Sequence, residues 1–146
     1  MVWNIVAIGL IGALVGSFLT TLIERLPRGE SSLRGRSRCP HCGHLLPAVE
    51  LVPMVSFLVL RGRCRRCKEP IPRWHFLVEF SAVTLFIAVA LLPPARSVIE
   101  LALLLSMLAI LLALTVIDLQ HMLLPDLLVG ALAAVGILRV VLNGSA

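Results

Sequence analysis

Four apolar runs dominate the chain. The first extends from Val2 to Ile23, the second from Trp74 to Leu92, and the third from Val98 to Ile117. A fourth, shorter run extends from about Leu127 to Leu142. A helix of about 20 apolar residues spans the ~30 Å hydrocarbon core of a bilayer. The pattern therefore predicts an all-α polytopic membrane protein with about four transmembrane helices.

A polar segment separates the first two runs. Proline and glycine interrupt residues 25–75 repeatedly, which predicts a compact, loop-rich insert rather than long helices. We expect residues 1–24 to form the first transmembrane helix and residues 76–146 to form three more. A secretory signal peptide begins with a positive region, and no Lys or Arg precedes Arg25. The first helix is therefore expected to be retained.

Composition and charge support the membrane assignment and give an orientation. Of the 146 residues, 59% are hydrophobic and 14% are charged, against about a quarter in soluble domains. Eleven of the thirteen Lys and Arg residues lie between positions 25 and 73. The positive-inside rule then makes the insert cytoplasmic, with the N-terminus outside and the Asp118–Asp126 connection on the insert's side. Membrane topology therefore accounts for the net charge of +5, with the lipid bilayer as the expected partner and no nucleic acid.

The insert contains every cysteine of the chain, in two Cys-x-x-Cys pairs. Four thiolates at this spacing are typical of a tetrahedral structural zinc site, so we expect a zinc-ribbon-like insert. The alternatives are two disulfides or four free thiols, and a reducing cytoplasm disfavours disulfides. Because four sulfurs complete the shell, His41 and His44 are interpreted as loop residues. The predicted zinc ligands are Cys39, Cys42, Cys64 and Cys67.

Two aspartates border the third and fourth runs. Asp118 closes an apolar helix at its C-terminus, where the helix dipole and low dielectric both disfavour a carboxylate, which indicates a functional role. The alternative is a simple interfacial charge. Asp126 follows Pro125 and suits the first turn of a helix, with at most a supporting role. The two would be ~12 Å apart along a helix, a poor catalytic pair unless the turn folds back.

Two further patterns concern helix contacts. Gly12, Gly16, Thr20 and Glu24 recur every four residues, so they form a stripe where another helix can approach closely. Glu79 lies near the predicted start of the second helix. It is either an ordinary helix-start carboxylate or a contact with the Arg-rich insert.

Several segments in order resemble the type IV prepilin peptidases, which are leader peptidases and N-methyltransferases of the bacterial inner membrane. Residues 16–27 resemble the family's first helix and its exit, although the family usually has Asn at the position of Thr20. Residues 117–126 match the motif that holds the first catalytic aspartate. The remaining similar segments are residues 36–45 and 60–67 in the cysteine loop, 50–56 between the cysteine pairs, and 72–79 at the next helix.

The resemblance implies aspartyl cleavage of prepilin-like leader peptides and methylation of the new N-terminus by S-adenosylmethionine. It gives Asp118 the role of first catalytic carboxylate. The family's second lies in a later Gly-x-Gly-Asp motif, and no aspartate follows Asp126 here. We therefore expect a short or truncated member, inactive as a peptidase alone, with a second chain as a possible source of the motif. The alternative is a non-catalytic, zinc-stapled membrane module or half of a split enzyme.

Overall fold

The computed structural model describes residues 2–30, 39, 41–47, 54–92 and 97–144, with side chains described between residues 5 and 142. The described chain is mainly helical, and an isolated antiparallel β-bridge joins Arg63 to Pro70. The elements are α1 (Val2–Arg25), the short 3₁₀ helix η1 (Leu26–Arg28), α2 (Val55–Val59), α3 (Arg73–Leu91), α4 (Val98–His121) and α5 (Asp126–Gly144).

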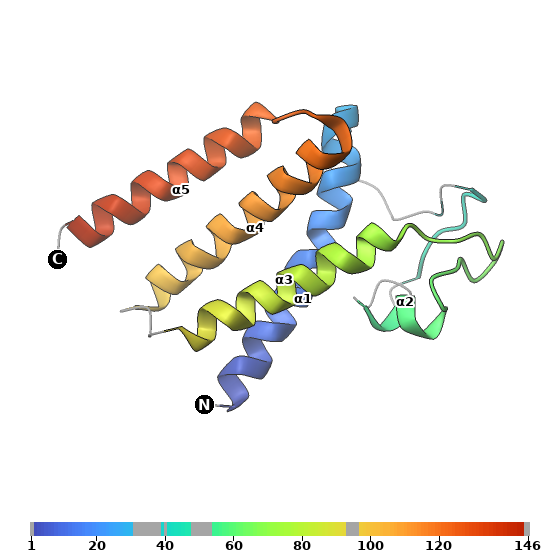
Figure 1. The fold of residues 1–146 in the computed structure, drawn as a ribbon, viewed down its shortest axis with the longest axis horizontal. Helices are drawn as coiled ribbons and strands as arrows, with labels where there is room; N and C mark the ends of the chain where they lie inside the picture. The colour runs from blue at the N-terminus through green and yellow to red at the C-terminus, as the bar shows by residue number, and fades with distance from the viewer. Residues whose placement is uncertain (1, 31–38, 40, 48–53, 93–96, 145–146) are drawn as a thin grey trace.

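The expected all-α membrane architecture is confirmed. Three segments of the described chain are long and apolar enough to cross a membrane, and they belong to α1, α3 and α4. The fourth predicted span corresponds to α5, which is not among those three. In Figure 1, α4 lies between α3 and α5, and α1 crosses α3. The insert projects from the end of the bundle where α1 ends and α3 begins.

The contact between α1 and α3 is the most extensive in the bundle, and glycine makes it close. A Cβ atom on Gly12 would lie 3.0 Å from the Val83 Cα, and one on Gly16 would lie 2.8 Å from the Glu79 Cα. The backbones thus meet without side chains between them, as small residues permit in membrane helices. The stripe predicted on the first helix is the face that packs against α3.

The buried core lies toward the insert's end of the bundle. Ile23, near the end of α1, and Ile117, near the end of α4, are both fully buried. Val78 from α3 and Leu128 from α5 complete the same cluster. Helix ends that flank the insert and the α4–α5 turn are therefore packed together. Ala82 and Phe86 in the middle of α3 are buried as well, whereas Leu10 and Leu14 of α1 are exposed, as contact with lipid permits.

Helices α4 and α5 form an antiparallel hairpin (Figure 1). α4 extends to His121, beyond the predicted end at Ile117, and Met122 ends it in a left-handed conformation with its N–H donating to the Asp118 carbonyl at 2.8 Å. Toward the far end of the hairpin, the Arg139 Nη2 of α5 lies 3.8 Å from the Glu100 Oε1 of α4. This ion pair joins the two helices within the apolar layer.

We predict that Gly16→Ala weakens the α1–α3 contact by about 1–3 kcal/mol, because the added methyl group meets backbone atoms that cannot rotate away. Gly130→Ala in α5 is the matched control, since a Cβ there has nothing within 4 Å. Thermal unfolding in detergent measures both. Equal melting temperatures for the two variants would contradict the close packing at Gly16.

Candidate functional site

The two cysteine pairs of the insert meet in one cluster. Their four sulfur atoms lie within 4.8 Å of one another, with 3.8 Å from Cys39 to Cys67 and 4.0 Å from Cys42 to Cys64. A tetrahedron of sulfurs about 2.3 Å from a central metal has edges of about 3.8 Å. All four cysteines are free, and the sulfurs are too far apart for disulfide bonds of about 2.05 Å. The cluster could therefore hold a metal ion, consistent with structural zinc.

Each cysteine pair is held by the same backbone turn. The N–H of Cys39 donates to the His44 carbonyl, and that of Cys64 donates to the Glu69 carbonyl, both at 2.9 Å. The residue after each pair, Gly43 or Lys68, has a positive φ and donates back to the first cysteine's carbonyl. Two equivalent turns thus present sulfurs to a common centre, as the spacing predicted.

The pKa values of the Cys64 and Cys67 thiols are shifted in opposite directions. Hydrogen bonds from the backbone N–H groups of Cys67 and Arg66 lower the pKa of Cys64 to about 6. For Cys67, the N–H of Glu69 favours the thiolate, but burial and the neighbouring sulfurs raise its pKa to about 12. A bound cation would relieve the repulsion between thiolates, so metal binding at this site releases protons.

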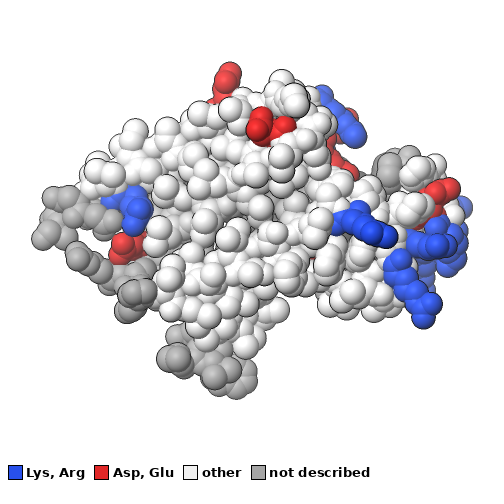
Figure 2. Space-filling model, viewed as in Figure 1, with Lys and Arg blue, Asp and Glu red and all other residues white. Residues whose placement is uncertain are grey.

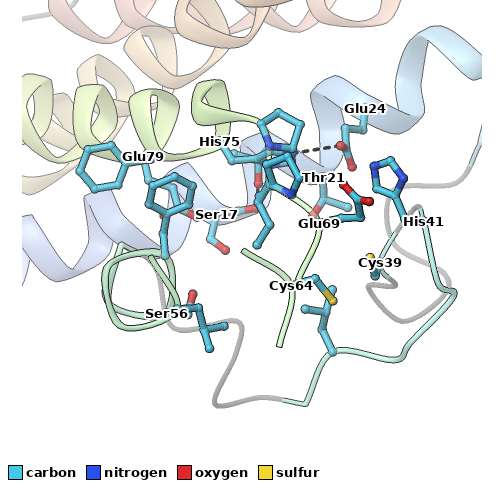
Figure 3. Close-up of a pocket in the computed structure, with 18 of the residues that line it drawn as sticks. Ser17, Thr21, Glu24, Cys39, His41, Ser56, Cys64, Glu69, His75 and Glu79 are labelled. Carbon is cyan, nitrogen blue, oxygen red and sulfur yellow. Dashed lines mark hydrogen bonds and ion pairs between the residues drawn. The ribbon is translucent and has the colours of Figure 1, made fainter. Parts of the chain in front are cut away.

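A cavity of about 690 Å³ lies between the membrane helices and the insert (Figure 3). Its size falls within the range of small-molecule sites, which is about 300–1,000 Å³. α1 contributes polar side chains to one wall, the insert forms another, and Cys39 and Cys64 place the metal site at its edge. The labelled lining residues are Ser17, Thr21, Glu24, Cys39, His41, Ser56, Cys64, Glu69, His75 and Glu79.

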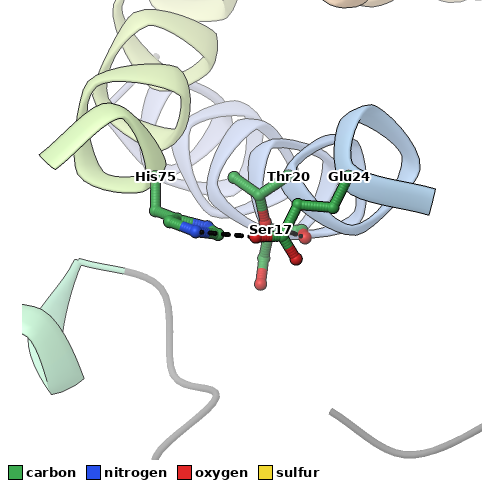
Figure 4. Close-up of polar contacts among 4 residues, drawn as sticks. All are labelled: Ser17, Thr20, Glu24 and His75. Carbon is green, nitrogen blue, oxygen red and sulfur yellow. Dashed lines mark hydrogen bonds and ion pairs between the residues drawn. The ribbon is translucent and has the colours of Figure 1, made fainter. Parts of the chain in front are cut away.

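An ion pair joins α1 to α3 at the wall of this cavity. The His75 Nε2 lies 3.2 Å from the Glu24 Oε1, and both side chains are partly shielded from solvent. Figure 4 shows this pair beside Ser17 and Thr20 of α1. The Thr20 hydroxyl donates to the Ser17 carbonyl at 2.7 Å, which satisfies it within its own helix. The pair therefore contributes charge to this wall beside Arg25 and Arg28, and Thr20 borders the cavity as a buried residue whose hydroxyl is already bonded.

Glu79 joins the insert to α3 from inside the cavity. Its Oε2 accepts a hydrogen bond of 2.7 Å from the backbone N–H of Met54, immediately before α2. The predicted contact with the insert thus exists, but its partner in the described chain is a backbone group rather than an arginine. The carboxylate fixes where α2 sits on α3.

Sequence reasoning missed the pairing of Glu24 with His75. The sequence pattern puts Glu24 on the helix-contact stripe and His75 at the end of the polar insert. The partners come from opposite sides of a long insert, so no local periodicity connects them. The available signal was that both flank helix ends beside the insert: Glu24 in the last turn of α1, and His75 in the first turn of α3.

The structure places Asp118 and Asp126 outside this cavity. Asp118 lies in the last turn of α4, and Asp126 is the first residue of α5. The connection Met122–Pro125 reverses the chain, so both carboxylates lie at the same end of the hairpin. Both residues are exposed, and neither carboxylate has a hydrogen bond or ion pair within the described part of the chain. The turn folds back, but it does not pair them.

Comparisons with known proteins identify the family of this chain. The family described as the Bacterial Peptidase A24 N-terminal domain matches residues 10–92, which contain most of α1, the cysteine insert and α3. A prepilin leader peptidase/N-methyltransferase of Myxococcus xanthus is 44% identical over 115 residues, covering 79% of this chain and 34% of that protein. No solved structure matches the chain significantly.

Two other relatives carry the same name and match more of the chain. The protein of Aeromonas hydrophila is 39% identical over 160 residues, covering 92% of this chain and 54% of its own length. The protein of Dichelobacter nodosus is 34% identical over 163 residues, which cover 93% of this chain and 56% of that protein. The chain thus spans between about a third and just over half of the length of these relatives. It belongs to the bacterial peptidase A24 family through the N-terminal domain.

The cluster predicts about one bound metal equivalent per chain, held by the four sulfurs. Cys64→Ser removes one ligand, so metal should be lost and the insert should become sensitive to protease. His44→Ala is the matched control, because this side chain is outside the sulfur cluster. Elemental analysis and limited proteolysis of purified protein measure both effects. A metal content unchanged by Cys64→Ser would contradict the assignment.

Proposed function

We propose that this chain works in the processing of prepilin-like substrates at the inner membrane, in leader cleavage and in methylation of the new N-terminus. The observation that carries the proposal is the polar cavity where the family's N-terminal domain packs its insert against α1 and α3. It lies at the end of the bundle where the described ends of the membrane helices converge. The relatives are named prepilin leader peptidase/N-methyltransferase, and that name covers both reactions.

Methylation is the reaction that the cavity suits best. When bound, S-adenosylmethionine supplies an electrophilic methyl group on a positively charged sulfur. The cavity is lined by the carboxylates of Glu24, Glu30, Glu69 and Glu79, which complement such a cation, and also by Arg25, Arg28 and Arg65. Leu14 and Phe18 extend the lining along α1 toward membrane depth, where the apolar N-terminal residues of a processed pilin would lie. One cavity can thus receive a polar cation and an apolar peptide end.

His75 has the position of a proton acceptor in this cavity. An α-amine attacks a methyl group through its lone pair and must then lose a proton. The Glu24 carboxylate accepts a hydrogen bond from Nε2 of His75, which leaves the other ring nitrogen able to take that proton. Glu24 orients the ring and stabilises the imidazolium that forms, so its role is to position His75.

Leader cleavage is assigned to Asp118, with Asp126 in a supporting role. Aspartyl proteolysis needs two carboxylates that share a proton, one activating water while the other protonates the leaving group. Asp118 supplies one of them by resemblance to the family motif. The second belongs to a Gly-x-Gly-Asp segment that these 146 residues lack. We propose that a further polypeptide segment, in a second chain where necessary, brings it to the insert's end of the bundle.

We further propose that the metal is zinc and that the insert is cytoplasmic. Four thiolates at tetrahedral spacing form a closed shell with no position for water, which is typical of structural zinc. The orientation follows from the basic residues of the insert, which Figure 2 shows gathered at one end of the molecule. Labelling from outside the cell, with an impermeant maleimide at a cysteine introduced at position 35, would contradict it.

The second candidate is a non-catalytic membrane module stapled by zinc. The exposed position of Asp118, with no partner among the described residues, favours it, because a catalytic carboxylate needs a partner. Methylation by the isolated chain decides between the two, since a purely structural module has no use for the cavity's carboxylates and histidine. A processed pilin peptide with a free N-terminal amine is the substrate that makes this test independent of cleavage.

We predict that Asp118→Asn abolishes the leader cleavage that this chain supports together with a polypeptide supplying Gly-x-Gly-Asp, because asparagine cannot relay a proton. Asp126→Asn should cost less, since a neutral side chain keeps the helix-start role. Leader removal from a prepilin in liposomes measures both. The chain alone should be inactive, and robust cleavage by it that both variants abolish would instead make Asp118 and Asp126 the catalytic pair.

We predict that His75→Gln lowers the rate of methylation by about 100-fold through loss of the proton acceptor, while metal content stays unchanged. Glu24→Gln should lower the rate less, because His75 remains. Thr84→Val is the control, as the Thr84 hydroxyl is exposed on α3 and donates only within its helix, to the Phe80 carbonyl. Methyl transfer from labelled S-adenosylmethionine to the processed peptide provides the measurement. Equal rates for His75→Gln and Thr84→Val would contradict the role.

A further inference from the structure

Helix α2 is amphipathic although it lies outside the spans. Ser56, Phe57 and Leu60 line the cavity, so one face of this short segment is turned inward. On the other face Leu58 is 63% exposed and Val59 is 74% exposed. Val55 completes this outer face at helical spacing and is also exposed. Three adjacent large apolar side chains therefore have no covering within the described part of the chain.

The outer face of α2 lies at the depth of a membrane helix. Glu79, which binds the Met54 N–H, is six residues into α3, about 9 Å along its axis. The Phe57 ring stacks on Phe76 of α3 with 5.3 Å between ring centroids. α2 is therefore held beside the first two turns of a helix that is apolar enough to span the membrane. A segment at this level meets the headgroup boundary, where amphipathic helices lie with their apolar face in the lipid.

A basic loop adjoins the same face. Residues 54–68 contain no acidic residue, and Arg61, Arg63, Arg66 and Lys68 are exposed. A hollow of about 490 Å³ in this loop is lined by Leu60, Arg61, Arg63, Cys64, Arg65 and Lys68. A concave surface lined with cations complements the phosphate of an anionic lipid headgroup.

The apolar face and the basic loop are joined by hydrogen bonds and close packing. The Gly62 N–H donates to the Phe57 carbonyl at 2.8 Å, which folds the loop back onto α2. A Cβ atom on Gly62 would lie 2.8 Å from the Phe57 ring, so only glycine allows this close contact. Gly62 also accepts a hydrogen bond of 2.7 Å from Ile71, just before α3. The loop and α2 are thus tied to each other and to the membrane helix.

We propose that α2 and the loop 61–68 together form a docking face for anionic lipid. Val55, Leu58 and Val59 enter the acyl boundary of the leaflet on the insert's side, and the basic side chains bind headgroup phosphates above them. The insert then lies on the membrane surface with the cavity between itself and the helices. This arrangement rests on packing and charge, and it stands whether or not the chain cleaves or methylates a pilin.

The test places a photoreactive p-benzoylphenylalanine at position 59 of the otherwise unchanged chain in lipid nanodiscs. Discs contain phosphatidylcholine alone or a mixture with phosphatidylglycerol, and mass spectrometry identifies the adducts after irradiation. We expect lipid adducts at position 59, with phosphatidylglycerol enriched over its share of the mixture. The matched control is position 45, where Leu45 is a partly exposed apolar residue on the other cysteine turn, and it should give no lipid adduct.

The charge contribution is tested by Arg61→Gln, Arg63→Gln and Lys68→Gln combined with the same photoreactive residue. Lipid adducts should persist while the enrichment of phosphatidylglycerol is lost, with metal content verifying that the insert remains folded. The same residue placed at position 55 repeats the measurement if position 59 is not tolerated. Absence of lipid adducts at both positions, or adducts with no preference for phosphatidylglycerol in the unaltered loop, would overturn the proposal.

Discussion

The close approach of α1 to α3 is the contact on which the other features depend. At Gly12 and Gly16 the two helices cross in close contact, with no side chain between their backbones. The turns beyond this crossing carry Glu24 and His75, whose side chains reach each other because the crossing has already brought their helices together. The same approach fixes both ends of the insert, which leaves α1 and returns into α3. A larger residue at the crossing would push the two helices apart, which would both separate the ion pair and widen the cavity.

The insert is organised by cross-links rather than by a hydrophobic core. Its described part contains a five-residue helix and isolated β-bridge residues, too little secondary structure to bury much apolar surface. The sulfur cluster would join its two halves once it holds a metal ion, and the Glu79 carboxylate anchors the segment before α2 to the membrane domain. Cross-links of this kind stabilise a small module that burial alone could not fold. They also let the insert form a cavity wall that polar side chains can line.

The sequence predicted those parts of the structure that depend on local pattern. Apolar runs gave the helices, with α4 longer than expected because its end is set by the left-handed Met122 rather than by loss of hydrophobicity. Cysteine spacing predicted the cluster, since each turn is local and sulfur chemistry allows few arrangements. The pairing of Glu24 with His75 and that of Glu79 with Met54 depend on how α3 lies against α1. That geometry is a tertiary property, and a single sequence contains no periodicity that reports it.

The α4–α5 turn shows why the methyl-transfer and proteolytic chemistries should be considered separately. Ile117 is fully buried in the bundle core, so the neighbouring Asp118 is held at a fixed height, yet its side chain is exposed. Leu119 and Met122 beside it are also largely exposed, although they are apolar. A water molecule activated there would not be shielded, and in the described chain no second carboxylate is bonded to Asp118 to share its proton. The Glu24–His75 pair, in contrast, has both of its members within the described chain, at the wall of the cavity. The two reactions that we propose therefore differ in what they ask of this chain: the proposed methylation would use a pair that is already formed, whereas the proposed cleavage would need a further segment to cover and complete Asp118.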